Sequence, residues 1–286
     1  MVRRSFSIII PTYGRSAEVA ALLDSINLTD YDHSLLEVIV VDQNDAIDLS
    51  DTIVRFEKSL DIKHIKVTKK GIAHAKNVGL EKAQHEIVTF ADDDSTYYPD
   101  TFSVCNQCFE DYPDIDFFYG KVYDRHKKKN VIRNWKRHSL KITKFNYHTN
   151  YIAIACFTKE KHLRFDERFG VGTKYGVGEE LDYLLQSLDR GYNVWYFPLI
   201  EVWHPEVNVF SMTEEKVFYY ARGYGAICKK HNSPIMIWNL FASSAYQFIM
   251  MVVLFLSTKR SAAKRRYLAL AGRIKGYLEY KEEKIC

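Results

Sequence analysis

Residues 86–94 read EIVTFADDD, a short apolar run that ends in three consecutive aspartates. An apolar run of this length, bounded by polar residues, is typical of a strand covered on both faces of a sheet. Three adjacent carboxylates repel one another, so the cluster is costly unless a cation neutralises it. The stretch therefore predicts a buried strand followed by a site for Mg²⁺ or Mn²⁺, which bind carboxylate oxygens and substrate phosphates. The alternative is a solvated turn that caps the next helix.

Similar apolar runs precede this one, and segments with helical periodicity separate them. The expected strands are residues 5–10, 36–41, 62–68 and 86–91, and the expected helices are residues 16–26, 49–60 and 72–83. This alternation predicts an α/β fold with a mostly parallel, Rossmann-like central sheet and helices on both faces. Such sheets bind ligands beyond the carboxyl ends of their strands, so the polar residues there are the candidate site.

The second half of the chain is less regular. Strands are expected at residues 151–158, 192–197 and 200–203, and a helix is expected at residues 179–190. Cys105 and Cys108 are three residues apart in an expected helix, without a second pair of ligands at zinc spacing. We interpret them as buried small apolar side chains.

Six short motifs resemble, in chain order, those of the inverting family 2 glycosyltransferases of the GT-A fold. They are SIIIPTY at residues 7–13, VIVVD at 38–42, the glycine-flanked AKN at 75–77, the DxD-type triplet at 92–94, GEE at 178–180, and His204 after YFP at 196–198. The matches run from about residue 5 to residue 204. The resemblance implies a GT-A fold and transfer of a sugar from a nucleotide-diphosphate donor.

Carried over by position, the resemblance implies a nucleotide-sugar pocket and a metal site. The implied nucleotide-sugar residues are Pro11, Thr12, Tyr13, Arg15, Asp42, Gln43, Lys76, Asp92 and Asp93, and the implied metal ligands are Asp94 and His204. Gln43 stands where the family often has a second aspartate that reads the base, and Lys76 stands where an arginine is common. An amide can both accept and donate a hydrogen bond, so a uracil base is not specified. A lysine keeps the positive charge for a phosphate but lacks the bidentate fork.

Glu179 and Glu180 occupy the place of the family's acceptor-side acidic pair. An inverting transfer needs one carboxylate to take the proton from the acceptor hydroxyl as it attacks. The resemblance implies Glu180 for that role, with Glu179 as the alternate and Asp182 as a third candidate. The alternative is that the pair only stabilises the N-terminus of a helix.

Residues 235–258 contain no charged side chain. As a helix they would be about 36 Å long, enough to cross a hydrocarbon core of about 30 Å. A single span would export the basic residues that follow, against the positive-inside tendency. Asn239, Ser243 and Gln247 would form one polar stripe, which favours a helix in the cytoplasmic leaflet with residues 235–275 on an anionic membrane surface. A buried core helix and a true span remain alternatives.

The composition agrees with a large folded enzyme. The chain has 286 residues, 47% hydrophobic, with a net charge of +4, and from Lys259 onward it has nine Lys or Arg against three Glu. This excludes a disordered tail, a collagen-like fibre and a small disulfide-stapled module. The odd number of cysteines and the short N-terminal apolar run indicate a reducing, cytoplasmic compartment. The basic stretch at residues 125–144, with Trp135 and Phe145, could bind nucleic acid, but the rest of the chain shows no nucleic-acid module, so no nucleic-acid partner is expected.

The sequence thus predicts a metal-dependent, inverting glycosyltransferase, peripheral or monotopic on the cytoplasmic face of the inner or plasma membrane. Its expected acceptor is a lipid-linked glycan in surface polysaccharide or glycoconjugate assembly. The expected domains are a catalytic domain at residues 1–231, divided at residue 95 into a nucleotide-sugar half and an acceptor half, and a membrane-associated segment at residues 232–286. The rival hypotheses are a sugar-phosphate nucleotidyltransferase and a non-catalytic membrane-bound scaffold.

Overall fold

The computed structural model describes residues 3–206 and 212–282. The chain divides into two compact units. We call residues 1–165 and 186–207 the sheet unit, and residues 166–185 and 208–286 the helical unit. These boundaries differ from the expected one at residue 231, because residues 214–230 group with the C-terminal helices and not with the sheet. The functional division at residue 231 stays a prediction.

The sheet unit is built on a mixed sheet whose strands follow the order β3-β2-β1-β4-β9-β6-β10-β5, with β7 beside β6 and β8 beside β10. The strands are β1 Phe6–Thr12, β2 Leu36–Asp42, β3 Asp61–Lys66, β4 Ile87–Phe90, β5 Thr96–Tyr97, β6 Phe117–Asp124, β7 Lys129–Asn130, β8 Leu140–Lys141, β9 Cys156–Thr158 and β10 Val194–Trp203. Strands β1 to β4 pair in parallel, and β9 joins them antiparallel to β6.

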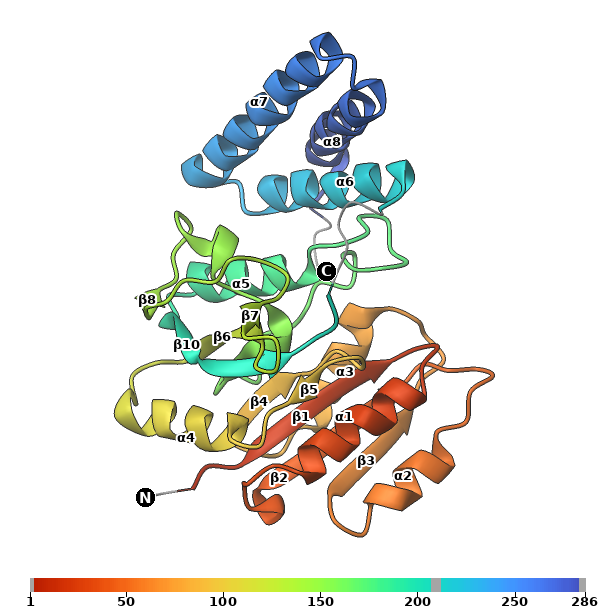
Figure 1. Cartoon of the computed structure of the whole chain (residues 1–286), viewed down its shortest axis with the longest axis vertical. Coiled ribbons are helices and arrows are strands. Elements are labelled where there is room, and N and C mark those ends of the chain that lie inside the picture. Colours follow the sequence, from red (N-terminus) through yellow and green to blue (C-terminus); the bar gives the residue numbers. More distant parts are fainter. Residues whose placement is uncertain (1–2, 207–211, 283–286) are drawn as a thin grey trace. The chain divides into compact units, whose positions relative to one another are not determined.

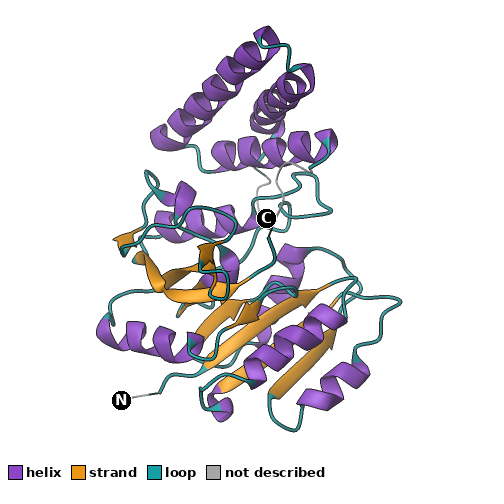
Figure 2. Ribbon diagram, viewed as in Figure 1, coloured by secondary structure: helices purple, strands orange, loops and turns teal. Residues whose placement is uncertain are grey.

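Helices cover both faces of the parallel strands (Figures 1 and 2). The helices of this part of the chain are α1 Ala17–Asn27, α2 Ser50–Phe56, α3 Ile72–Lys82, α4 Thr101–Asp111 and α5 Glu179–Asp189, the last with residues in both units. Strands β2 and β3 follow on one side of β1, whereas β4 lies on its other side. Because parallel crossovers are right-handed, α3 lies on the face opposite to α1 and α2.

The parallel strands are buried because they carry large aliphatic residues on both faces. Every residue of β1 and β2 is buried, whereas the edge strand β3 is half-buried. Helix α3 packs so closely on β1 that a Cβ at Gly79 would lie 2.3 Å from Cγ2 of Ile9. The four strands and three helices expected before residue 95 are confirmed, with ends that differ by a few residues.

Beyond residue 95 the expected strands need correction. Only residues 156–158 of the expected strand at 151–158 form a strand, because Ala153–Ala155 forms a turn of 3₁₀-helix. The strands expected at 192–197 and 200–203 are one strand, β10, with an irregular register between Tyr196 and Glu201. Strand β6 was not expected, because its aromatic sequence FFYGKVYD lacks the Ile and Val run of the first strands. The expected cysteine helix is α4, and Cys105 and Cys108 are free and buried.

The helical unit contains α6 Glu214–Lys230, α7 Pro234–Leu256 and α8 Arg260–Glu279. Helices α6 and α8 touch backbone to backbone through glycine. A Cβ at Gly225 would lie 2.0 Å from the carbonyl oxygen of Arg273, and one at Gly276 would lie 1.9 Å from that of Arg222. The basic tail is therefore a packed helix, which its charge alone did not predict.

Helix α7 confirms the expected uncharged helix at residues 235–258. It is long and apolar enough to cross a membrane, and only 6% of its most apolar window is buried. The alternative of a buried core helix is therefore wrong.

Candidate functional site

The three aspartates form a tight turn directly after β4. The backbone N–H and the hydroxyl of Ser95 both donate to the carbonyl oxygen of Asp92, at 2.9 and 2.7 Å. The chain then enters β5, which pairs antiparallel with the end of β10 so that Thr96 faces Trp203. This pairing brings His204 to the aspartate turn.

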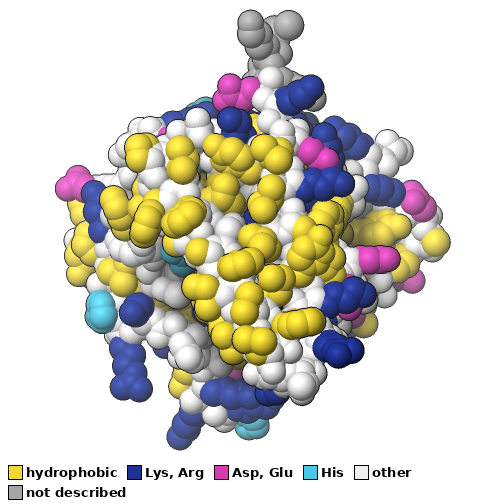
Figure 3. All heavy atoms as spheres, turned by 90° about the horizontal axis from the view of Figure 1, so that it is seen from above, with side chains coloured by type: hydrophobic (Ala, Val, Ile, Leu, Met, Phe, Trp, Pro, Cys, Tyr) yellow, Lys and Arg dark blue, Asp and Glu magenta, His cyan; other side chains and the backbone are white. Residues whose placement is uncertain are grey.

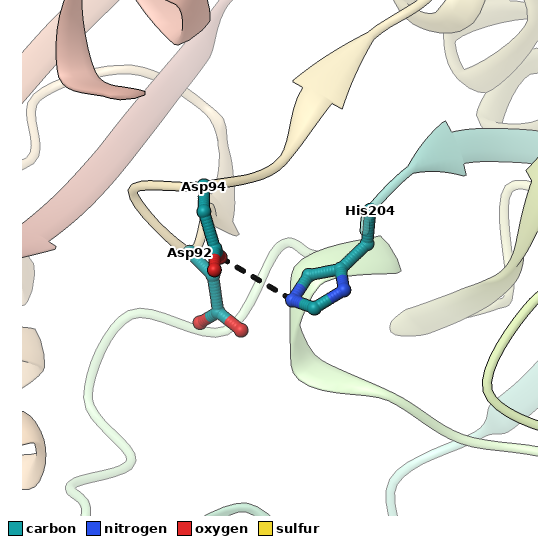
Figure 4. Close-up of side chains that lie close together, drawn as sticks. All are labelled: Asp92, Asp94 and His204. Carbon is teal, nitrogen blue, oxygen red and sulfur yellow. Dashed lines mark ion pairs between the residues drawn. The ribbon is translucent and has the colours of Figure 1, made fainter. Parts of the chain in front are cut away.

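Asp92, Asp94 and His204 form one cluster of ligand atoms, all within 4.8 Å of one another (Figure 4). The Nε2 atom of His204 lies 3.3 Å from Oδ1 of Asp94. The hydrogen bond from His204 lowers the pKa of Asp94, against the opposing effect of burial. Burial alone would lower the pKa of His204, but the hydrogen bond and charge of Asp94 outweigh it and raise that pKa.

This donor set fits a divalent cation. Two carboxylates and an imidazole suit Mn²⁺, and the carboxylates also suit Mg²⁺. An ion with bonds of about 2.0–2.2 Å separates its ligand atoms by at most about 4.4 Å, so small side-chain rotations would complete the site. The sequence interpretation of a cation site after β4 therefore has a matching geometry, while the ligand roles of Asp94 and His204 stay predictions.

Asp93 is not part of this cluster, and its carboxylate is bonded to the end of β1. The parallel register that places Ile9 beside Phe90 carries Thr12 to the level of Asp93, and the Thr12 hydroxyl donates to Oδ2 of Asp93 at 2.8 Å. Arg15 Nη1 lies 2.6 Å from Oδ1 of Asp93 and 2.7 Å from Oδ2 of Asp94. Burial raises the pKa of Asp93 in spite of these two partners.

Arg15 is therefore the basic residue of the sequence-derived pocket that pairs with the aspartates. Burial would lower its pKa, but the charges of Asp93 and Asp94 raise it. Its side chain is 38% exposed, so the guanidinium can also reach a ligand beyond the strand ends.

Asp42 orders the loop after β2. Its side chain is fully buried, and Oδ1 accepts from both the backbone N–H and the side-chain amide of Asn44, each at 2.8 Å. Its Oδ2 lies 3.0 Å from Nε2 of His64 on β3. The Asn44 side chain in turn accepts from the backbone N–H of Gly14 at 2.6 Å, which joins the loops after β1 and β2. Sequence reasoning gave Asn44 no role, although it lies only two residues after Asp42, and it missed His64, because only the β2–β3 pairing brings His64 to Asp42.

The remaining residues of the sequence-derived pocket on this side are Tyr13, Pro11 and Gln43. Tyr13 is 61% exposed, with Nζ of Lys70 5.5 Å from its ring centroid, so its ring can stack on a base. Pro11 is buried within β1. The Gln43 side-chain oxygen accepts from the N–H of Gly71 at 2.7 Å, which leaves its amide donor for another acceptor. A direct role of any of these residues toward a nucleotide stays a prediction.

Lys76 is fully buried in α3, where its ammonium lies 5.2 Å from the ring centroid of Phe165. The neighbouring Asn77 side chain donates to the Phe165 carbonyl oxygen at 2.9 Å and accepts from its N–H at 2.8 Å. The AKN motif thus holds residue 165 in position. The expected phosphate contact of Lys76 stays a prediction.

Glu179 and Glu180 open α5, where their charge also suits the helix N-terminus. Both belong to the helical unit, and Glu179 is buried whereas Glu180 is half-buried. Asp182, the third candidate base, is fully buried and lies 2.8 Å from both Nζ of Lys230 and Nε2 of His231. Asp182 is therefore committed to an ion-pair network that joins α5 to α6, a role that the sequence did not reveal.

Similar proteins agree with this architecture. Residues 7–168, more than half of the chain, match the family described as Glycosyl transferase family 2. An uncharacterised glycosyltransferase from Haemophilus influenzae is 37% identical over 116 residues, which are 40% of this chain and 37% of that protein. A GalNAc(5)-diNAcBac-PP-undecaprenol β-1,3-glucosyltransferase from Campylobacter jejuni is 36% identical over 91 residues, which are 31% of this chain and 29% of that protein. The chain therefore matches 37% of the length of the first relative and 29% of the length of the second.

The fold is also that of a solved glycosyltransferase. The mannosyltransferase PcManGT from Pyrobaculum calidifontis, in complex with GDP-Man and Mn²⁺, superposes with a TM-score of 0.64. The match is 16% identical and covers 98% of this chain and 89% of that chain. The predicted GT-A fold is confirmed. The family match shows that this chain belongs to glycosyl transferase family 2, and the fold agrees with that membership.

Proposed function

We propose that the chain transfers a sugar from a nucleotide-diphosphate donor to an acceptor hydroxyl, with Mn²⁺ or Mg²⁺ held by Asp92, Asp94 and His204. The observation that carries this proposal is the convergence of these three side chains within 4.8 Å of one another, at the carboxyl end of β4. It is supported by the similar fold of PcManGT, which is solved with GDP-Man and Mn²⁺.

In this proposal the strand ends bind the donor. The bound cation would neutralise charge that develops on the leaving diphosphate. Arg15 bridges Asp93 and Asp94 and presents a positive charge to the same phosphates. The exposed ring of Tyr13 stacks on the base, and Gln43 reads its edge. The remaining proposed nucleotide-sugar residues are Pro11, Thr12, Asp42 and Lys76.

Glu180 is the proposed catalytic base, with Glu179 as the alternate. One carboxylate takes the proton from the acceptor hydroxyl while the oxygen attacks the anomeric carbon opposite to the diphosphate, which inverts the configuration. The half-burial of Glu180 and its place in the first turn of α5 agree with such a role. Asp182 is a poorer candidate because Lys230 and His231 already bind its carboxylate.

The proposed acceptor is a lipid-linked glycan, used at the cytoplasmic face of a membrane. The name of the Campylobacter jejuni relative describes transfer to an undecaprenol-diphosphate-linked glycan, which supports this acceptor class. The apolar α7 and the basic residues after it support a role of residues 232–286 in membrane association.

The experiment is incubation of the protein with a panel of nucleotide sugars, with and without Mn²⁺, and measurement of released nucleoside diphosphate. We expect Asp94→Ala to lower metal-dependent release about 100-fold or more, and Glu180→Gln to lower transfer by about 10²–10⁴-fold. Asp51→Ala, an exposed aspartate of α2, is the matched control and should retain activity. Consumption of no donor, or variants as active as the wild type, would overturn the proposal.

A further inference from the structure

Helix α7 turns a broad apolar surface to the outside. Ten of its large apolar side chains are exposed, among them Phe241 at 64%, Phe255 at 63% and Leu256 at 75%. Hydrophobic side chains gather on the face of the molecule shown in Figure 3, with lysines and arginines at the edges. Soluble monomers seldom expose apolar patches beyond a few hundred Å², so this surface indicates a partner.

The polar stripe of α7 is used for packing within the unit. Gln247 is buried, and its side-chain oxygen accepts from Nη1 of Arg266 on α8 at 3.1 Å. Asn239 and Ser243, eight and four residues before Gln247, are half-buried on the same side. The apolar side therefore faces away from α8. Helix α8 adds exposed apolar residues of its own, Tyr267, Ile274 and Leu278, which share one side of that helix.

Between the end of α7 and the start of α8 lies a groove of about 1140 Å³, which we call the cation groove. Four basic side chains line it, those of Lys259, Arg260, Arg265 and Arg266, together with apolar side chains that include Met250 and Leu254. Among the described residues, no acidic side chain lines it. The groove therefore combines four positive charges with an apolar wall.

The positive charges of the cation groove are not neutralised within the described part of the chain. Arg265 and Arg266 donate to neutral oxygens, of Met212 at 2.6 Å and of Gln247 at 3.1 Å. Across residues 3–206 and 212–282, none of the four cations forms an ion pair. Lys264 on the same helix, by contrast, pairs with Glu214 at 2.7 Å.

The start of α8 adds donors at the same place. The first N–H groups of a helix have no partner within the helix, and Lys259 at the N-cap provides no side-chain cap. A helix N-terminus carries a partial positive charge that favours phosphate. Ser261 and Ala262, which line the groove, belong to this first turn.

We propose that α7 and α8 form a membrane-docking surface, in which α7 lies in the plane of an anionic bilayer and the cation groove binds the phosphates of anionic phospholipids. The exposed apolar residues of α7 enter the acyl region, and Trp238 and Tyr246 suit the headgroup boundary. If α7 lies in the plane of the membrane, Gln247 stays bonded to Arg266 and the cations of the groove stay at the headgroups. If α7 spanned the membrane, this hydrogen bond and these cations would be removed from the membrane surface. This inference deepens the membrane association in the proposed function by naming the lipid class and the residues that bind it.

The test is co-sedimentation of the full chain with two kinds of vesicle, one of neutral phosphatidylcholine and one of phosphatidylcholine with roughly 30% anionic phosphatidylglycerol. Each basic residue near an anionic surface should contribute about 1 kcal/mol to binding. No donor, acceptor or metal is present, so failure of binding is distinguishable from failure of catalysis. We expect tight, salt-sensitive binding to the anionic vesicles and much weaker binding to the neutral ones. Lys259→Glu with Arg260→Glu should weaken anionic binding by about 30-fold or more.

Three further measurements make the result specific. Lys58→Glu with Lys82→Glu changes the net charge equally on exposed residues of the sheet unit and should bind as the wild type does. Phe241→Ser with Phe248→Ser should reduce binding to both kinds of vesicle, while thermal unfolding and donor consumption stay unchanged for all these variants. Soluble glycerol phosphate at millimolar concentration should not compete with the vesicles for the protein. Competition would indicate a site for free phosphate, which binds its ligand without a bilayer.

Three results would overturn the proposal. The first is equal binding of the wild type and the Lys259→Glu, Arg260→Glu variant to anionic vesicles. The second is a stable dimer in sedimentation equilibrium that Phe241→Ser dissociates, because a second copy would then cover the surface. The third is competition by glycerol phosphate.

Discussion

The ion-pair network around Asp182 offers a test that separates structural from catalytic carboxylates on one helix. Asp182 is fully buried, and Lys230 joins it to Asp166, at 2.8 and 2.7 Å. Arg168 also pairs with Asp166, at 2.6 Å. The change Asp182→Asn keeps the shape of the side chain but removes the charge that Lys230 faces.

The expected cost follows from the burial. Removing one partner of a buried ion pair costs about 3–5 kcal/mol, because the other charge stays buried and uncompensated. Lys230 retains Asp166, and asparagine can still accept from His231 at 2.8 Å. We therefore expect the lower end, about 3 kcal/mol, which corresponds to a fall in Tm of roughly 6–12 °C for a chain of this size. Thermal unfolding followed by circular dichroism measures it.

A matched pair of variants completes the test. Glu180→Gln, on the same helix turn but half-buried, should change Tm by less than about 2 °C while transfer falls. Adding Lys230→Met to Asp182→Asn should restore part of the stability, because Asp166 keeps Arg168 as its partner. The reasoning is refuted if Asp182→Asn unfolds at the wild-type temperature. If this variant also loses transfer, then Asp182, and not Glu180, is the base.

Two further predictions concern the cation site and the helix packing. Mn²⁺ affinity should rise with pH through the raised pKa of His204, because only the neutral imidazole binds the ion. Calorimetric titrations of His204→Asn should show a weaker dependence on pH. A wild-type affinity that does not change between about pH 5.5 and 8 would contradict the ligand role of His204. Gly276→Ala should destabilise the helical unit by about 1–3 kcal/mol, because the new Cβ would lie 1.9 Å from the Arg222 carbonyl oxygen. Denaturant unfolding measures this loss of stability, with Ser261→Ala, at an exposed residue, as the control. Equal unfolding midpoints for the two variants would show that α6 and α8 do not pack this closely.

The parallel half of the sheet was predictable because its signals are local. Strands β1, β2 and β4 are rich in Ile, Val and Phe; β1 and β2 end in a polar residue, and Asp92 follows two residues after the end of β4. Strand β6 escaped prediction because what identifies it as a strand is its position between β9 and β10, not its own aromatic sequence. Helix α8 escaped for a similar reason, since its packing depends on glycines that meet α6 backbone to backbone.

By itself the sequence determined the class of the protein and half of its candidate site. Aliphatic runs alternating with amphipathic segments specify a parallel sheet whatever the rest of the chain does, and parallel strands bring Thr12, Asp42 and Asp93 to one edge. The resemblance implied Asp94 and His204 as shared metal ligands, but only the tertiary structure shows how the two side chains meet, because β5 and β10 pair across more than a hundred residues and no local pattern encodes that pairing. It also decided that Asp182 is an ion-pair partner of Lys230, since burial and charge neutralisation are properties of the packed helices and not of the residue order.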